Sequence, residues 1–287
     1  MQLSRRRALL GLGFLILTWG GLLTGASLFL AFLGLGGGVP ATDSVSAFRL
    51  ALGNSLVLIF TFGVSGLLAL PFWKEAWGGV PFRFAPIPSA VWGWTVLLML
   101  GLQAVLPWLS LDAESFQLPP AWRDIEASLE TAEVHVETIM ISLLTHGTLL
   151  WNLIFLSVVP GIVEELFFRG AFQGLLSRIV PPTAAIWITA FIFSAVHGQV
   201  YGFVPRMLLG ALMGYLVAYS GSLLPAIWAH FLNNAYATLT GYVAIHFLGQ
   251  PEFIKSTYRP PVWIALVGAA MAGAAAYQVY RLLRRHD

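Results

Sequence analysis

Val163-Glu164-Glu165-Leu166-Phe167-Phe168-Arg169 places two adjacent carboxylates and a guanidinium inside an apolar run from Thr148 to Leu176. The run has the composition of a membrane span. An ionised group near the centre of a bilayer costs about 2.5–3.5 kcal/mol on insertion scales, so such groups rarely persist without a partner or a task. We therefore expect a functional site at this stretch. The alternative is a structural ion-pair cluster that joins helices.

The composition indicates a polytopic helical membrane protein. Of its 287 residues, 58% are hydrophobic and 10% are charged, whereas soluble domains carry about 25% charged residues. The formal net charge is only +2 and no basic face is evident, so we expect membrane lipid and no nucleic acid as a partner. The chain has no cysteine, which excludes disulfides, a thiolate nucleophile and Cys-ligated zinc.

Eight segments approach the length of about 20 apolar residues that a transmembrane helix needs, so we predict an all-α bundle of about eight spans. They lie near residues 8–35, 51–72, 91–111, 148–178, 183–199, 204–220, 222–248 and 261–284. The first run follows Arg5, Arg6 and Arg7 and is too long for a signal peptide, so we expect a retained span. Prolines at the predicted starts of three spans support those boundaries, namely Pro181-Pro182, Pro205 and Pro225.

The distribution of Lys and Arg favours a cytoplasmic location for both termini. With that orientation the inner side holds Arg5, Arg6, Arg7, Lys74, Arg83, Arg178, Arg281, Arg284 and Arg285. The outer side holds the smaller set Arg49, Arg123, Arg206, Lys255 and Arg259. We therefore predict an integral membrane protein with both termini inside. Its short loops favour a bacterial chain, and thus a bacterial cytoplasmic membrane.

The one sizeable polar insertion runs from residue 112 to residue 147. Apolar residues recur in it at helical spacing among the acids Asp124, Glu126, Glu130, Glu133 and Glu137. This pattern indicates an amphipathic helix at the membrane interface, and a solvated connector is an equal alternative. Elsewhere Gly170-x-x-x-Gly174 and Gly210-x-x-x-Gly214 are weak signals of close helix packing.

Few polar residues lie deep inside the predicted spans. Besides Glu164, Glu165 and Arg169, they include His197 and the His230–Asn234 pair. At a rise of 1.5 Å per residue, Glu164 and His197 each lie roughly 21 Å from the inner end of their spans. His230 and Asn234 lie roughly 12 and 18 Å along theirs. Residues from three helices can thus meet at one depth.

Helix geometry separates the two glutamates. Glu165 and Arg169 are four residues apart on one face, so we expect a structural ion pair. Glu164 is rotated by about 100° and is free to face the histidines. His197 is suited to hold a water for which Glu164 is the general base. His230 and Asn234 share a face and are donors suited to an oxyanion, so this set indicates hydrolysis of a peptide carbonyl.

The same residues resemble the CPBP family, which comprises CAAX prenyl proteases and bacteriocin-processing intramembrane peptidases. The resemblance rests on three ordered motifs, Glu164-Glu165-x-x-x-Arg169, Phe193-x-x-x-His197 and His230-x-x-x-Asn234. It implies that Glu164 and His197 activate water, that His230 and Asn234 stabilise the oxyanion, and that Glu165, Arg169 and Phe193 support them.

Within one membrane domain, 1–287, the resemblance assigns the catalytic CPBP core to residues 148–248. Residues 1–111 are N-terminal spans of unassigned role, 112–147 form the connector and 261–284 form the last span.

The resemblance also implies a membrane-anchored or lipidated protein or peptide as substrate, and it says nothing about oligomeric state. Glu164, His197 and His230 offer three ligands for zinc, but His-Glu-x-x-His is absent and we expect no metal or other cofactor.

Two other classes of function compete with the protease. A proton-coupled transporter would string its polar residues along the membrane depth. A non-catalytic immunity or scaffold protein would not depend on Glu164 or His197.

Overall fold

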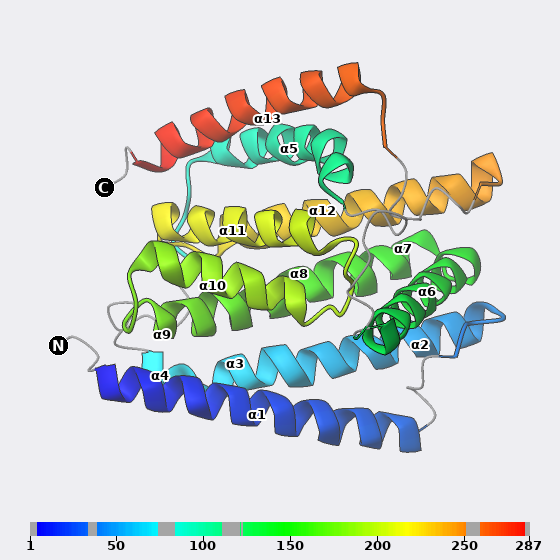
Figure 1. The fold of residues 1–287 in the computed structure, drawn as a ribbon, viewed down its shortest axis with the longest axis horizontal. Helices are drawn as coiled ribbons and strands as arrows, with labels where there is room; N and C mark the ends of the chain where they lie inside the picture. Colours follow the sequence, from blue (N-terminus) through cyan, green and yellow to red (C-terminus); the bar gives the residue numbers. More distant parts are fainter. Residues whose placement is uncertain are drawn as a thin grey trace.

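The computed structural model describes residues 5–33, 39–73, 84–110, 121, 123–250 and 259–284. In this part of the chain every regular element is a helix, and most helices run side by side along the long axis of the molecule (Figure 1). The predicted all-α membrane bundle is confirmed. Six of the described helical segments are long and apolar enough to cross a membrane.

The predicted count of eight spans is not confirmed. Its fifth segment is the helix α10 (Pro182–Ala195), which has only 14 residues. Its seventh is α12 (Leu224–Val243), continued by η6 (Ala244–Leu248). The α12 helix is long, but His230, Asn233 and Asn234 lower its hydropathy. Neither is among the six long apolar segments.

The N-terminal part of the bundle packs against one side of the central helices (Figure 1). It consists of α1 (Arg5–Phe32), α2 (Ser44–Leu58), η1 (Ile59–Val64), α3 (Ser65–Leu68) and α4 (Leu70–Trp73). Asp43 begins α2 with a capping box, because its Oδ1 accepts from the backbone N–H groups of Val45 and Ser46, each at 2.8 Å.

The opposite side of the bundle is formed by α5 (Ser89–Val105), followed by η2 (Leu106–Leu109), and by α13 (Val262–Leu283) (Figure 1). These two helices approach backbone to backbone, since a Cβ added to Gly101 would lie 2.6 Å from the Gly268 carbonyl oxygen. On its other side α5 packs against α12.

The central layer is a continuous helical segment with several local geometries. It runs through α7 (Leu149–Leu153), η4 (Ile154–Val158), α8 (Val159–Glu165), η5 (Leu166–Gln173) and α9 (Gly174–Leu176). The η4 and η5 segments are π-helical, and wide turns of this kind are frequent at functional sites. The segment is flanked by α10, by α11 (Phe203–Ser220) and by α12.

The predicted proline boundaries are confirmed. Pro182 is the first residue of α10, Pro205 the third of α11 and Pro225 the second of α12. These positions suit proline because the first turn of a helix has no intrahelical use for the N–H group that proline lacks. The beginning of α1 and the end of α13 lie at the same end of the bundle (Figure 1).

The predicted connector contains α6 (Arg123–His146), a helix that crosses the bundle obliquely (Figure 1). Most of its first half is exposed, as expected of an amphipathic or solvated helix. Glu133 departs from the expectation of a solvated acidic face, because its side chain is buried. Residues 112–120, including Pro119-Pro120, lie outside the described residues.

Candidate active site

The two glutamates of the central segment lie at the end of α8, directly before the π-helical η5, and both are buried in the bundle. Glu165 and Arg169 are 0% exposed and Glu164 is 6% exposed. Buried charges of this kind need partners, because desolvation is costly unless it is offset by ion pairs and hydrogen bonds.

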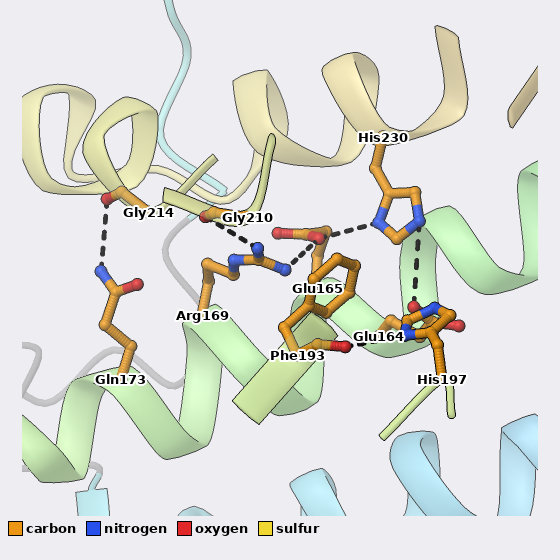
Figure 2. A network of polar contacts seen from close by, with 9 residues as sticks. All are labelled: Glu164, Glu165, Arg169, Gln173, Phe193, His197, Gly210, Gly214 and His230. Atoms are coloured by element: carbon orange, nitrogen blue, oxygen red, sulfur yellow. Dashed lines mark hydrogen bonds and ion pairs between the residues drawn. The ribbon is translucent and has the colours of Figure 1, made fainter. Parts of the chain in front are cut away.

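Arg169 is the partner of Glu165, as its spacing predicts. Its Nη1 donates to Glu165 Oε1 at 2.6 Å and its Nη2 donates to the Gly210 carbonyl at 2.9 Å (Figure 2). The guanidinium also lies over the ring of Phe193, 4.5 Å from the ring centroid. One arginine thus joins η5 to α10 and α11.

Gln173 extends this connection by one further turn. Its Nε2 donates to the Gly214 carbonyl at 3.2 Å (Figure 2). A Cβ on Gly214 would lie 2.8 Å from Gln173 Oε1, so the position has no room for a side chain. Because Gly210 and Gly214 have no side chains, Arg169 and Gln173 of η5 can reach the backbone carbonyls of α11.

His230 bridges both glutamates from α12. Its Nδ1 donates to Glu165 Oε1 at 2.8 Å, and its Nε2 lies 3.8 Å from Glu164 Oε2 (Figure 2). Glu165 therefore has two partners, Arg169 and His230, whereas the sequence predicted only the first. The bond to Glu165 fixes the plane of the imidazole and directs its Nε2 edge toward Glu164.

His197 does not lie within a helix, although the sequence placed it in a span over residues 183–199. The helix α10 ends at Ala195, and His197 lies in the turn that follows, before Gly198 with its φ of +67°. Its Nδ1 donates to the Phe193 carbonyl at 2.7 Å (Figure 2). In a neutral imidazole this leaves Nε2 as an acceptor.

The Phe193 ring contacts three polar side chains of the site. Its ring packs edge-on against His197 and His230, with centroid distances of 5.1 and 5.7 Å, while Arg169 lies over its face. This arrangement holds both imidazoles by contact with one buried ring.

A cavity of about 80 Å³ joins these groups. It is lined by Glu164, Phe193, His197, Arg206, Leu209, Met213, His230, Asn233 and Asn234. A water molecule needs about 10–15 Å³ of such volume and several polar partners, so the cavity is large and polar enough to hold water. All four predicted catalytic residues lie on its wall.

Two polar residues of this cavity were not predicted. Arg206, which the sequence analysis counted as an outer-side charge, lies in the first turn of α11 and its Nη2 donates to Gln199 Oε1 at 2.7 Å. Asn233 donates from Nδ2 to Asn234 Oδ1 at 3.2 Å. Adjacent helical residues rarely share a face, so only the polarity of the Asn233-Asn234 pair in an apolar helix would have signalled it.

Among the described residues, no group of three or more His, Asp or Glu side chains has an arrangement that would hold a metal ion.

The fold and this site define the class of the molecule: an integral membrane protein of apolar helices that surround a buried carboxylate–imidazole cavity. Residues 146–236 match the family described as type II CAAX prenyl endopeptidase Rce1-like. Within this segment the chain is thus similar to the CAAX prenyl endopeptidases. No curated protein and no solved structure matched the chain.

The matched segment runs from the end of α6 into α12 and holds all three sequence motifs. It confirms the predicted family. The helices α1 to α5 and α13 lie outside it.

Proposed function

We propose that the protein is a glutamic-type intramembrane endopeptidase, which cleaves a peptide bond near the membrane-embedded or lipidated C-terminal region of a substrate protein. The observation that carries this proposal is the single small cavity that Glu164, His197, His230 and Asn234 line together. A small polar space that can hold water next to a carboxylate is what peptide hydrolysis inside a membrane needs.

In the proposed first step, a water molecule lies between Glu164 and the Nε2 of His197. Glu164 accepts one of its protons as the oxygen attacks the peptide carbonyl carbon, while His197 orients the water through its free ring nitrogen. The Phe193 carbonyl supports this arrangement, because it binds the Nδ1 proton of His197 and so presents Nε2 as the acceptor.

The attack converts the carbonyl oxygen into an oxyanion. His230 and Asn234 are the proposed donors, from Nε2–H and Nδ2–H. Because the Nδ1 proton of His230 is directed to Glu165, donation from Nε2 requires the doubly protonated ring. With that ring charged, the cluster of Glu164, Glu165, Arg169 and His230 has no net charge, which suits its burial.

In the last step Glu164 returns the proton to the leaving nitrogen, the C–N bond breaks, and a carboxylic acid and an amine are released. No metal takes part in the proposed mechanism. We further propose a bacterial cytoplasmic membrane with both termini on the cytoplasmic side. The shared end of α1 and α13 supports the second point, since it requires both termini to lie on one side.

The test uses purified protein in liposomes and a library of membrane-tethered peptides, followed by mass spectrometry of the products. Cleavage is expected for the parent and is expected to fall by several orders of magnitude in Glu164→Gln. Glu130→Gln, which removes an exposed carboxylate of α6, is the matched control and should cleave normally. Cleavage that persists in Glu164→Gln would overturn the general-base role.

The same assay separates the competing classes. A non-catalytic scaffold predicts no cleavage by the parent, and a transporter predicts instead a proton flux across the liposome membrane that Glu164→Gln abolishes. Treatment with a chelator should leave cleavage intact. Inhibition that added zinc reverses would contradict the metal-free mechanism.

A further inference from the structure

A chain of three side-chain amides leads from α5 into the candidate active site. Gln103 Nε2 donates to Asn233 Oδ1 at 3.0 Å, and Asn233 Nδ2 donates to Asn234 Oδ1 at 3.2 Å. Asn233 and Asn234 each accept a hydrogen bond through the side-chain oxygen from the amide before them. The last one, Asn234, lines the cavity with Glu164 and His230.

The direction of these bonds determines what Asn234 offers to the cavity. Since its oxygen accepts from Asn233, its nitrogen is left as the group available to a ligand. Within the described part of the chain the Asn234 Nδ2 donates to no protein group. Rotation of this amide by 180° would present an oxygen lone pair to the oxyanion and would repel it.

The orientation of Asn233 is determined in the same way. Its oxygen accepts from Gln103, so its nitrogen is the atom that reaches Asn234. Hydrogen bonds that run in one direction polarise one another, which strengthens the donor at the end of the chain. The two bonds therefore both orient the Asn234 amide and make it a better donor.

The anchor of this chain lies outside the segment that matches the CAAX protease family. Gln103 belongs to α5, which is held against α13 by the contact of Gly101 with Gly268 and packs on α12. The helix α5 thus contributes to the site, although the sequence analysis left the role of residues 1–111 unassigned.

We propose that Gln103 and Asn233 are positioning residues, which hold the Asn234 side chain with its NH₂ group toward the oxyanion of the peptide substrate. This inference rests on the proposed peptidase function. Neither residue is assigned a reaction step of its own. The same logic applies to the other proposed donor, His230, which Glu165 orients through its second nitrogen.

The experiment measures kcat and KM on a peptide that the parent cleaves, together with thermal unfolding in the same liposomes. Asn234→Ala is expected to lower kcat by about 10²–10³-fold, the range for one lost oxyanion donor. Asn233→Ala and Gln103→Ala should lower kcat by about tenfold with KM unchanged, because the substrate is bound equally well before the oxyanion forms.

The isosteric changes Asn233→Asp and Gln103→Glu give the sharper test, since they keep the volume but remove the donor. In Asn233→Asp the carboxylate accepts from the Asn234 NH₂ group and turns it away from the cavity. Its kcat should therefore approach that of Asn234→Ala. Asn54→Ala, which removes an exposed amide of α2, is the control and should match the parent.

A double-mutant cycle separates positioning from a general structural effect. In the Asn234→Ala background, adding Asn233→Ala or Gln103→Ala should cause no further loss of kcat, because the group that they orient is gone. An equal loss in both backgrounds would overturn the inference, as would full activity of Asn233→Asp. Normal cleavage by Asn234→Ala would instead contradict the proposed oxyanion role itself.

Discussion

The Nδ1 atom of His230 lies 2.8 Å from Oε1 of Glu165, the same oxygen that receives Arg169 at 2.6 Å. One carboxylate oxygen therefore joins α12 to η5 and fixes an imidazole that lines the candidate active site. Glu165 Oε2 has no hydrogen-bond partner among the described residues. Within this part of the chain, Oε1 therefore makes all the hydrogen bonds of the Glu165 side chain.

Replacement of Glu165 by Gln should impair both folding and turnover. The amide oxygen can still accept, but the buried Arg169 loses its counter-charge, and breaking a buried pair costs about 3–5 kcal/mol. His230 also loses the carboxylate that holds its Nδ1. Thermal unfolding in liposomes should show a lower midpoint. The protein that remains folded should have a reduced kcat, and an unchanged kcat would contradict the orienting role of Glu165.

Arg169→Ala should reduce the yield of folded protein at least as strongly as it reduces turnover. It takes one of the two partners of the buried Glu165 carboxylate away, leaving only His230, and removes the bond to the Gly210 carbonyl. The double variant Arg169→Met with Glu165→Gln should recover part of the lost yield, because it leaves neither charge unpaired. Normal yield of Arg169→Ala with a purely kinetic loss would argue against the structural role.

Gly214→Ala should destabilise the contact between η5 and α11. The added Cβ would lie 2.8 Å from both Gln173 Oε1 and Ile186 Cγ2, and overpacking of this kind costs about 1–3 kcal/mol. Gly13→Ala is a suitable control, since a Cβ there meets nothing within 4 Å. We expect a lower unfolding midpoint for the first variant only, and equal midpoints for both would contradict the close approach.

The candidate site residues could be picked out of the sequence because polar groups are rare in apolar helices. The three motifs were visible as isolated charges and imidazoles, and helical spacing placed Arg169 beside Glu165. Periodicity alone did not reveal that Glu165 also binds His230, because 65 residues separate them and only the packing of α12 on α8 brings them together.

Other features depend on tertiary contacts that no local pattern encodes. The π-helical turn of η5 follows Glu165 without a distinctive sequence signal, and Gln103 reaches Asn233 across 130 residues. The predicted spans 183–199 and 222–248 extend beyond the helices α10 and α12 into the turns that flank them, so one short helix and one polar helix resemble full spans in the sequence. Glu133 looked like a solvated acid, since the residues around it on α6 are polar or exposed.

Glu133→Gln should change the pH dependence of stability. Glu133 lies on α6, which is not among the six spans, and burial raises the pKa of its carboxyl, although hydrogen bonds to the backbone of Tyr201 and the charge of Arg206 oppose the shift. A carboxyl whose pKa is higher in the folded protein favours folding when it is protonated. Its contribution is thus fully present below the pKa of the unfolded chain and is lost as the pH rises through the folded pKa.

The parent should accordingly lose stability as the pH rises above the ordinary pKa of a glutamate, relative to Glu133→Gln, which cannot ionise at this position. The Gln oxygen can still accept from the backbone of Tyr201, so the variant keeps this contact. Unfolding midpoints measured at several pH values should converge at low pH and diverge in favour of Glu133→Gln at neutral pH. A parent that is the more stable protein at pH 7 would mean that the attraction of Arg206 outweighs the cost of burying the charge, and would contradict this prediction.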